Sequence, residues 1–304
     1  MLVDTFQCFM NRILSPFTTF NQKKTFLFCP RLKNLKVSKV YTTDVVIAAA
    51  GRGKRVGATQ NKLLLDLNQN SDRDEKAGEE KLFGKNVTTL LEYGLKTFQE
   101  YPGIRNIFLV VSKEDFQILQ PWAEGEGLIL VEGGERRQDS VHKALEHIHQ
   151  HDELPDMVLI HDGARIFCTK VLIDRILDVC RENGSGIPVI PIHDTVRRIR
   201  TKQESSRDWI EKLENSLEKD DLNCELLDRN ELFAVQTPQG FRFEDLWEAS
   251  LKSREENWDV TDDASMLEKM GKSVQPVAGE MGNLKITTAE DLEYARHQFQ
   301  SSKL

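Results

Sequence analysis

The chain has 304 residues, enough for one large domain or two of ordinary size. Its net charge of −8 disfavours bulk nucleic-acid binding, which requires a basic surface, and its 30% charged and 39% hydrophobic residues are typical of a soluble globular protein. The five cysteines are scattered without a Cys-x-x-Cys pair, so we expect a reducing compartment and neither a disulfide framework nor a zinc knuckle.

Residues 1–43 differ in composition from the rest of the chain. They carry seven Lys or Arg residues and one acid, so their charge is +6, and residues 44–304 carry −14. A basic, acid-poor segment with many hydroxyl side chains resembles a transit peptide, and a disordered bacterial extension is the alternative. We therefore expect a cytoplasmic bacterial protein or, if the segment is a transit peptide, a plastid protein.

From residue 44 onward, apolar strand patterns alternate with helical spacing of apolar residues. Strands are predicted over residues 44–50, 104–111, 128–131, 157–160, 187–192, 232–235, 273–277 and 283–287. Helices are predicted over residues 87–101, 115–122 (ending near Pro121), 139–149 and 170–181, and further helices begin at the N-caps Thr261 and Thr288. The alternation predicts an α/β fold of the Rossmann-like kind, a mostly parallel sheet with helices on both faces.

Two charged stretches interrupt this alternation. Residues 69–86 predict a solvated insertion. Residues 202–223 also carry apolar side chains at helical spacing, which predicts either a solvated amphipathic helix or an arm that packs on a partner subunit. We therefore expect an extension over residues 1–43 and one domain over residues 44–304, with the insertion and a projecting dimerisation arm at about 193–230.

The first predicted strand runs into the glycine-rich segment Ala48-Ala49-Ala50-Gly51-Arg52-Gly53-Lys54-Arg55. Such a turn exposes backbone N–H groups that bind phosphate oxygens, and Arg55 and Lys62 add positive charge. The segment is neither a Walker A loop nor a complete Gly-x-Gly-x-x-Gly motif. It predicts a nucleotide triphosphate site, and a tight turn with solvated cations is the alternative.

Three further loops, residues 132–140, 161–165 and 193–198, follow predicted strands and carry glycines, acids and arginines. In open parallel sheets, ligands bind beyond the carboxyl ends of the strands. We therefore expect these loops and the glycine-rich segment to meet at one edge of the sheet.

Short motifs at fixed positions extend this pattern along the chain. They are Ala-Ala-Gly-x-Gly-x-Arg (49–55), Gly-Gly-x-x-Arg-x-Asp-Ser (133–140), His-Asp-x-Ala-Arg (161–165), Asp-Thr (194–195), Asp-Arg (228–229), Gln-Thr-Pro-Gln-x-Phe (236–241), Thr-Asp-Asp-Ala-Ser (261–265) and Asn-x-Lys-Ile-Thr (283–287). With these motifs in this order, the chain resembles the 2-C-methyl-D-erythritol 4-phosphate cytidylyltransferases of non-mevalonate isoprenoid biosynthesis.

The resemblance implies a nucleotidyltransferase that converts CTP and methylerythritol phosphate into CDP-methylerythritol and pyrophosphate. It implies Arg55 and Lys62 as catalytic cations, and Mg²⁺ on the phosphates with Asp162 nearby. The nucleotide-binding residues that it implies are Ala49, Ala50, Gly51, Gly53, Gly133, Arg137, Ser140, Asp162 and Lys285. The substrate-binding residues that it implies are Thr195, Arg229, Thr261 and Lys285.

In this family Thr195 and Arg229 would lie on an arm lent by the neighbouring subunit, so the resemblance implies a homodimer with arm exchange. We expect no nucleic-acid partner. We also expect no membrane partner, because no apolar run approaches the ~20 residues of a membrane-spanning helix.

The chain departs from the family pattern beside Lys62, where Asn61 and Leu63 replace the usual proline and glutamine, and at Ile166, which replaces a proline. We therefore expect a less rigid approach to Lys62. Two alternatives stay open: a ribitol-5-phosphate cytidylyltransferase, which the Asp228-Arg229 pair and residues 261–264 disfavour, and a non-catalytic nucleotide-binding protein on the same fold. A metal site at His147 and His151 is a weaker hypothesis.

Overall fold

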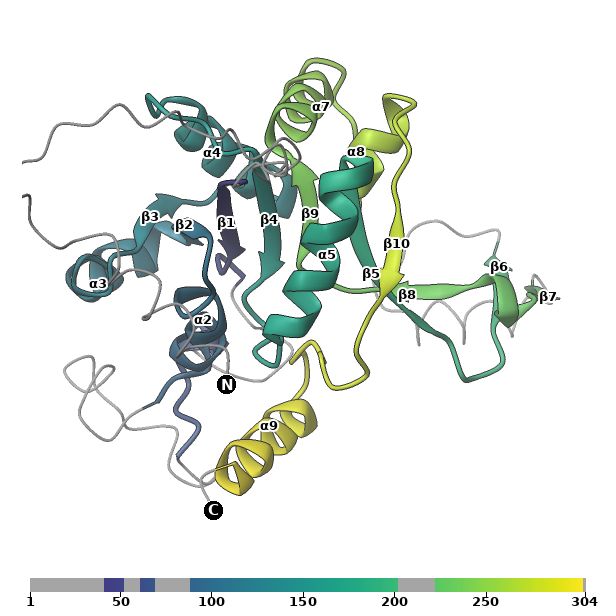
Figure 1. Cartoon of the computed structure of the whole chain (residues 1–304). Helices are drawn as coiled ribbons and strands as arrows, with labels where there is room; N and C mark the ends of the chain where they lie inside the picture. The colour runs from purple at the N-terminus through teal and green to yellow at the C-terminus, as the bar shows by residue number, and fades with distance from the viewer. Residues whose placement is uncertain (1–40, 52–60, 69–87, 202–221, 303–304) are drawn as a thin grey trace, which may run out of the picture. The chain divides into compact units, whose positions relative to one another are not determined.

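The computed structural model describes residues 41–51, 61–68, 88–201 and 222–302 (Figure 1). The predicted leader, apart from its last three residues, and the charged insertion lie outside the described residues, as do Gly53, Arg55 and most of the predicted arm. The division into extension and domain therefore stays a prediction. Within the part that is described, no helix has the length and apolar character to cross a bilayer.

An eight-stranded sheet forms the centre of the described chain (Figure 1). Its path runs β10-β5-β9-β4-β1-β2-β3, and β8 pairs with β5. The strands are β1 (Thr43–Ala48), β2 (Ile104–Val111), β3 (Ile129–Glu132), β4 (Met157–Asp162), β5 (Ser185–Pro191), β8 (Phe233–Val235), β9 (Gln239–Arg242) and β10 (Pro276–Ala278). Strands β1 to β4 pair in parallel, as do β5 and β10, whereas β9 runs antiparallel between β4 and β5.

The central strands are buried on both faces because consecutive side chains point to opposite sides of a sheet. Val45 and Ile47 of β1 belong to a core with α2 (Leu90–Gln99), α3 (Lys113–Gly125) and α5 (Lys170–Asn183). Val46 belongs to the core on the opposite face, with α4 (Arg137–His149), α7 (Phe243–Glu255) and α8 (Ala264–Lys269). This arrangement confirms the predicted α/β fold with helices on both faces.

A third, smaller core attaches the C-terminal helix α9 (Ala289–Ser301) beside the short 3-10 helix η3 (Lys62–Leu64). Its buried side chains are Leu65, Leu67, Leu90, Ile166, Ile286, Leu292, Ala295 and Phe299. The residue that replaces the expected proline, Ile166, therefore contributes apolar packing here. As predicted, α9 begins at Thr288, whose side chain and that of Asp291 form a reciprocal capping box.

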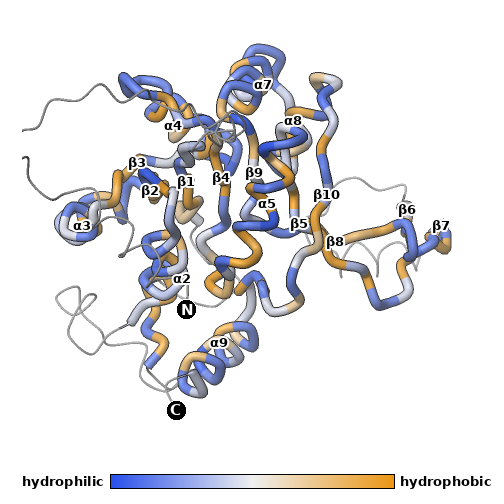
Figure 2. Tube along the Cα trace, in the orientation of Figure 1, coloured by the Kyte–Doolittle hydropathy of each residue, from blue (hydrophilic) through white to orange (hydrophobic). Residues whose placement is uncertain are grey.

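The chain leaves β5 into a separate two-stranded antiparallel sheet, β6 (Arg197–Thr201) and β7 (Leu222–Leu226), followed by the 3-10 helix η6 (Arg229–Glu231). Apolar side chains are exposed on this hairpin at Ile199 and Leu226 and on β8 at Phe233 and Val235. Figure 2 shows β8 as a continuous apolar segment, whereas α5 and α9 alternate between polar and apolar residues. The role of this region as a dimerisation arm stays a prediction.

Three local predictions are wrong. Pro121 lies inside α3 instead of ending it, because Leu119 and Ala123 on either side are buried in the core and outweigh the lost hydrogen bond. The N-cap of α8 is Asp263 and not Thr261, and the carboxylate of Asp262 accepts from the Ser265 N–H.

The third wrong prediction is the strand over residues 283–287, which form no strand. Among the described elements, α7, β6, β7 and β9 were not predicted, and neither were the 3-10 helices η3 and η6. The apolar spacing at Phe243, Leu246 and Ala249 in α7 was the available signal.

Helix α5 packs closely on the sheet where two glycines face each other, Gly186 of β5 and Gly240 of β9. A Cβ on Gly186 would lie 2.8 Å from the backbone oxygen of Ile176, and one on Gly240 would lie 2.6 Å from the Ile176 side chain. Both contacts are too short for real atoms, so the glycines set the distance between helix and sheet.

We predict that Gly186→Ala lowers the free energy of unfolding by about 1–3 kcal/mol, because the new methyl group meets backbone that cannot move aside. Urea denaturation of the variant and the wild type measures this change. Gly125→Ala is the matched control, because a Cβ at the end of α3 meets no atom within 4 Å. Equal stability of the two variants would contradict the prediction.

Candidate active site

The site lies where the strand order reverses. From β1 the chain moves outward to β2 and β3 and then returns to β4 on the other side of β1. Connections on opposite sides leave a crevice at the carboxyl ends of the two central strands, where ligands bind in open α/β sheets. The segments after β1, β3 and β4 line a cavity of about 410 Å³ there, a volume in the range of small-molecule sites.

Most of the predicted nucleotide-binding residues within the described chain line this cavity together with Lys62. They are Ala49, Ala50, Gly51, Arg137, Ser140, Asp162 and Lys285. The fourth predicted loop, residues 193–198, is not among the lining residues and leads into the β6–β7 hairpin instead.

A second cavity of about 460 Å³ adjoins the first. Thr261 and Lys285, both predicted to bind the second substrate, line it. Arg137, Asp162 and Lys285 line both cavities, so two ligands placed there would meet at one cluster of charges.

Of the predicted site residues that the structure describes, three line neither cavity. The first is Gly133, whose N–H donates to the carbonyl of Val111 at 2.7 Å and whose own carbonyl accepts from Lys143 at 2.8 Å. These bonds fix the end of β3, and the next residue, Gly134, lines the cavity instead. The other two are Thr195 and Arg229, which lie beside the hairpin, where the Arg229 guanidinium donates to the carbonyl of His193.

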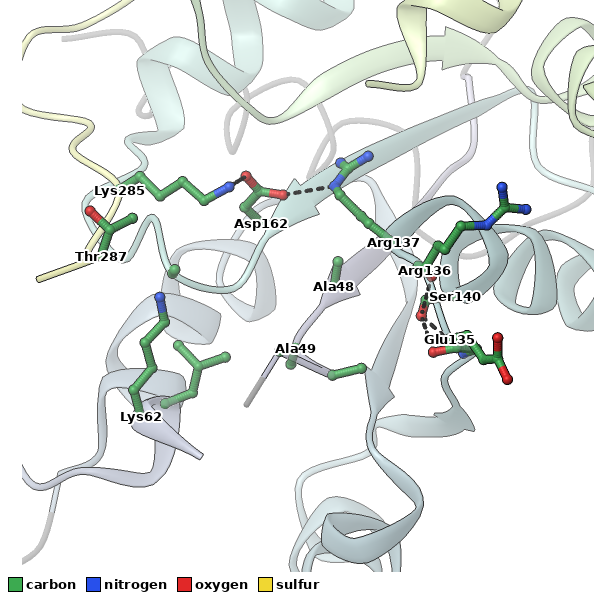
Figure 3. Close-up of a pocket in the computed structure, with 15 residues that line it drawn as sticks. Ala48, Ala49, Lys62, Glu135, Arg136, Arg137, Ser140, Asp162, Lys285 and Thr287 are labelled. Carbon is green, nitrogen blue, oxygen red and sulfur yellow. Dashed lines mark hydrogen bonds and ion pairs between the residues drawn. The ribbon is translucent and has the colours of Figure 1, made fainter. Parts of the chain in front are cut away.

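Asp162 holds two cations at the junction of the cavities (Figure 3). Its Oδ1 accepts from Arg137 Nε at 3.1 Å, and its Oδ2 accepts from Lys285 Nζ at 2.6 Å. Burial by itself would raise the pKa of this carboxyl, but the charges of Arg137 and Lys285 outweigh it and hold the pKa well below its usual range. Asp162 is therefore ionised at neutral pH and acts as a fixed anion.

Arg137 also contacts a second carboxylate, that of Asp263, which is 1% exposed and lies 2.8 Å from the guanidinium. Burial raises the pKa of Asp263, and Arg137 opposes this. The sequence motif at residues 261–265 contains Asp263, but nothing in it indicated a partner on α4. Sequence analysis therefore missed that Arg137 is held from two sides.

Lys62 extends from η3 towards the segment that carries Lys285 and Thr287 (Figure 3). Its ammonium donates to the carbonyl of Ile286 at 2.5 Å. The neighbouring residues are not loosely held: Asn61 and Leu63 are both buried, and the side chain of Asn61 caps η3. These contacts hold the start of the turn, and the expected loss of rigidity beside Lys62 stays a prediction.

His161 completes a buried polar network behind Asp162. Because a carbonyl only accepts, its Nε2 carries the proton that is donated to Arg165 O at 3.0 Å, and its Nδ1 accepts from the Thr237 hydroxyl at 3.1 Å. The same Thr237 oxygen accepts from the Asp162 N–H at 3.0 Å. Burial lowers the pKa of His161 to about 4, so the ring is neutral at pH 7 and keeps this tautomer.

The two histidines of the weaker metal-site hypothesis have a structural explanation. The rings of His147 and His151 lie edge-on to each other, with centroids 5.8 Å apart, and both contact Phe108. Burial raises the pKa of the Cys168 thiol, which makes it a poor nucleophile.

Comparisons with known proteins agree with this geometry. Residues 43–301 match the family model of 2-C-methyl-D-erythritol 4-phosphate cytidylyltransferase. A relative of that name from Microcystis aeruginosa is 36% identical over 257 residues, which cover 83% of this chain and 96% of the relative. One from Bacillus cytotoxicus is 32% identical over 252 residues, covering 82% and 93%.

Solved structures give the same result. The cytidylyltransferase of this name from Thermus thermophilus is 27% identical, with a TM-score of 0.57, and the match covers 84% of this chain and 98% of that one. A 4-diphosphocytidyl-2C-methyl-D-erythritol synthase from Anaerococcus prevotii supports the fold. It is 24% identical, with a TM-score of 0.64, and the match covers 86% of this chain and 96% of that one.

We predict that His161 makes the protein less stable as the pH falls from about 6.5 to about 4. In that window the unfolded chain binds a proton at this residue and the native chain does not, so lowering the pH from 7 to 5 costs about 2 kcal/mol. Urea denaturation at both pH values measures this loss in the wild type. His161→Gln cannot titrate and should lose less stability between the two pH values; an equal loss would contradict the prediction.

Proposed function

Because the chain belongs to the 2-C-methyl-D-erythritol 4-phosphate cytidylyltransferase family, we propose that it transfers the cytidylyl group of CTP to 2-C-methyl-D-erythritol 4-phosphate and releases pyrophosphate. The observation that carries this proposal is the pair of adjoining cavities with Arg137, Asp162 and Lys285 in common. A nucleotidyltransferase must hold two anionic substrates side by side, and shared cations at the junction of two cavities meet that requirement.

In the proposed reaction, a phosphate oxygen of methylerythritol phosphate forms a bond to the α-phosphorus of CTP while the bond to the pyrophosphate oxygen breaks. The attacking phosphate is already ionised, so the protein does not need to remove a proton. Catalysis then consists of positioning the substrates and stabilising the charge that develops on the α-phosphate. Lys62 and Arg55 would supply that stabilisation, with Arg55 outside the described residues.

The backbone after β1 would hold the nucleotide. The N–H of Ala49 already donates to Val110 O at 2.8 Å, so that amide has no hydrogen left for a ligand. Gly51 has open space around its α-carbon, which suits close approach of a phosphate. On the other wall, the Gly134 N–H donates to the Ser140 hydroxyl oxygen at 3.0 Å, which holds the loop after β3 in place. We assign nucleotide binding to these two loops.

Lys285 would contact both substrates, because it lines both cavities. Asp162 holds it and Arg137 at the junction, so their charges are in place before a substrate arrives. Such preorganisation lowers the cost of reorganising the site during the reaction.

The residues present fit a magnesium ion carried by the triphosphate. Among the residues that the structure describes, no group of three or more His, Cys, Asp or Glu side chains is arranged to hold a metal. Asp162 and Glu135 are the two carboxylates that line the first cavity, and Mg²⁺ usually takes one or two carboxylates together with substrate phosphates and water. When bound, the ion would neutralise phosphate charge beside Asp162.

The proposed enzyme acts as a homodimer. Thr195 and Arg229 line neither cavity of their own chain, and apolar side chains of β8 and the β6–β7 hairpin are exposed next to them. A second copy of the chain would cover these apolar side chains and receive Thr195 and Arg229 at its substrate cavity. This arrangement makes each active site depend on two subunits.

We predict that Lys62→Ala lowers kcat by ~10²–10³, as expected for the loss of one fixed charge at the transition state. The assay is pyrophosphate release from CTP with methylerythritol phosphate, and ribitol 5-phosphate is tested in parallel. Lys252→Ala, which removes an exposed lysine of α7, is the control and should keep the wild-type rate. An unchanged rate in Lys62→Ala would remove this lysine from the mechanism, and a preference for ribitol 5-phosphate would overturn the assigned substrate.

A mixing experiment tests the composite site. Lys62→Ala and Arg229→Ala should each be nearly inactive alone. Refolded together at equal concentration, they should recover about a quarter of wild-type activity, because half of the dimers are mixed and each mixed dimer holds one intact site. Sites built from a single chain would recover no activity.

A further inference from the structure

We propose that Asn61 is a positioning residue that holds the Lys62 turn against the nucleotide loop and against helix α3. This inference rests on the proposed function, since it assigns Asn61 a part in presenting Lys62 to the transferring phosphate. The chain carries Asn61 where the family pattern leads us to expect a proline. Asn61 acts through other groups and does not itself reach the cavity lining.

Asn61 links three separate elements through one side chain. Its Nδ2 donates to the carbonyl of Ala49, at the end of β1, at 3.0 Å. The same nitrogen donates to Asp115 Oδ2, in the first turn of α3, at 2.9 Å. Its Oδ1 accepts from the N–H of Leu63 at 3.1 Å, which caps η3. The side chain therefore joins the nucleotide loop, a core helix and the turn that carries Lys62.

The orientation of the amide follows from its partners. Nδ2 faces a carbonyl and a carboxylate, which only accept, while Oδ1 faces an N–H, which only donates. Both amide hydrogens are used. Asn61 is 7% exposed, so water does not readily replace these bonds, and a lost partner leaves a buried polar group unsatisfied.

The turn that carries Lys62 needs such a link. Helix η3 has three residues, and a single 3-10 turn has little stability of its own. Leu63 and Leu64 are buried and anchor one side of the turn, and Asn61 anchors its start. Lys62 lies between these anchors, so the direction of its side chain depends on both. Its ammonium then reaches the carbonyl of Ile286.

The isosteric change Asn61→Asp separates the capping of η3 from the hydrogen bonds to Ala49 and Asp115. A carboxylate still accepts from the Leu63 N–H and still caps η3. It no longer donates to Ala49 O or to Asp115, and two carboxylates then face each other across a distance that held a hydrogen bond. The variant keeps the cap and the shape of the side chain but loses the link to the nucleotide loop and to α3.

A second change can restore part of this link. In Asn61→Asp combined with Asp115→Asn, the amide introduced on α3 can donate to the carboxylate introduced beside Lys62. The like-charge contact disappears and one hydrogen bond returns with its direction reversed. The double variant therefore tests whether the contact between the two positions, and not either residue alone, carries the effect.

The experiment measures kcat, KM for CTP and the melting temperature of the full chain for the wild type, Asn61→Asp, Asp115→Asn and the double variant. Assays are run well below every melting temperature, with CTP and methylerythritol phosphate. Asn106→Asp is the matched control, because Asn106 also donates its side-chain amide to a carboxylate, that of Asp44, at the opposite end of the sheet.

We expect Asn61→Asp to lower kcat by about 10- to 100-fold, since small misplacements of a catalytic group reduce rates by up to ~10²-fold. The double variant should recover part of this loss, while Asn106→Asp should lose stability without losing kcat. Wild-type kcat in folded Asn61→Asp, or equal kcat in the single and double variants, would overturn the inference. An inactive wild type would overturn the proposed function, and this role with it.

Discussion

Both cavities depend on the ion pairs that the carboxylate of Asp162, at the end of β4, forms with two cations. This carboxylate holds Arg137 from α4 and Lys285 from the C-terminal segment, and these two cations mark the junction where two anionic substrates would meet. A buried anion is stable only when cations and hydrogen bonds compensate for lost hydration. Arg137 is in turn held by Asp263, so the compensation extends across α4 and α8. His161 and Thr237 fix the backbone behind Asp162 from a different direction.

Different parts of the fold hold the three cations Arg137, Lys285 and Lys62 that line the first cavity. Arg137 lies on α4, which packs in the core on one face of the sheet, and Asp162 holds both Arg137 and Lys285. Lys62 lies on η3, whose Leu63 and Leu64 are buried in the core on the opposite face of the sheet. The C-terminal segment contributes to both walls, because Lys285 pairs with Asp162 while the next residue, Ile286, accepts from Lys62 and packs in the third core. The segment therefore couples the two halves of the site.

The departures from the family pattern are explained by packing and hydrogen bonding. Leu63 is buried in the core on one face of the sheet. Ile166 packs in the third core and lies so close to Gly94 that a Cβ added to this glycine would be 3.3 Å from Ile166. Asn61 replaces the conformational restriction of a proline with three hydrogen bonds, and its φ of −60° is the value a proline would also hold. In this chain, hydrogen bonds to Ala49, Leu63 and Asp115 therefore hold the turn in place of a covalent ring.

The sequence by itself determined the α/β class, the alternation of strands and helices, and the loops after β1, β3 and β4 as walls of the site. These features follow from the period of apolar residues and from short motifs, which neighbouring residues encode. Only the tertiary structure decided that β9 runs antiparallel, that Asp263 pairs with Arg137 and that Lys62 reaches Ile286, 224 positions away. Local sequence patterns do not indicate which residues far apart in the chain contact each other, because those contacts depend on how the helices and the sheet pack together.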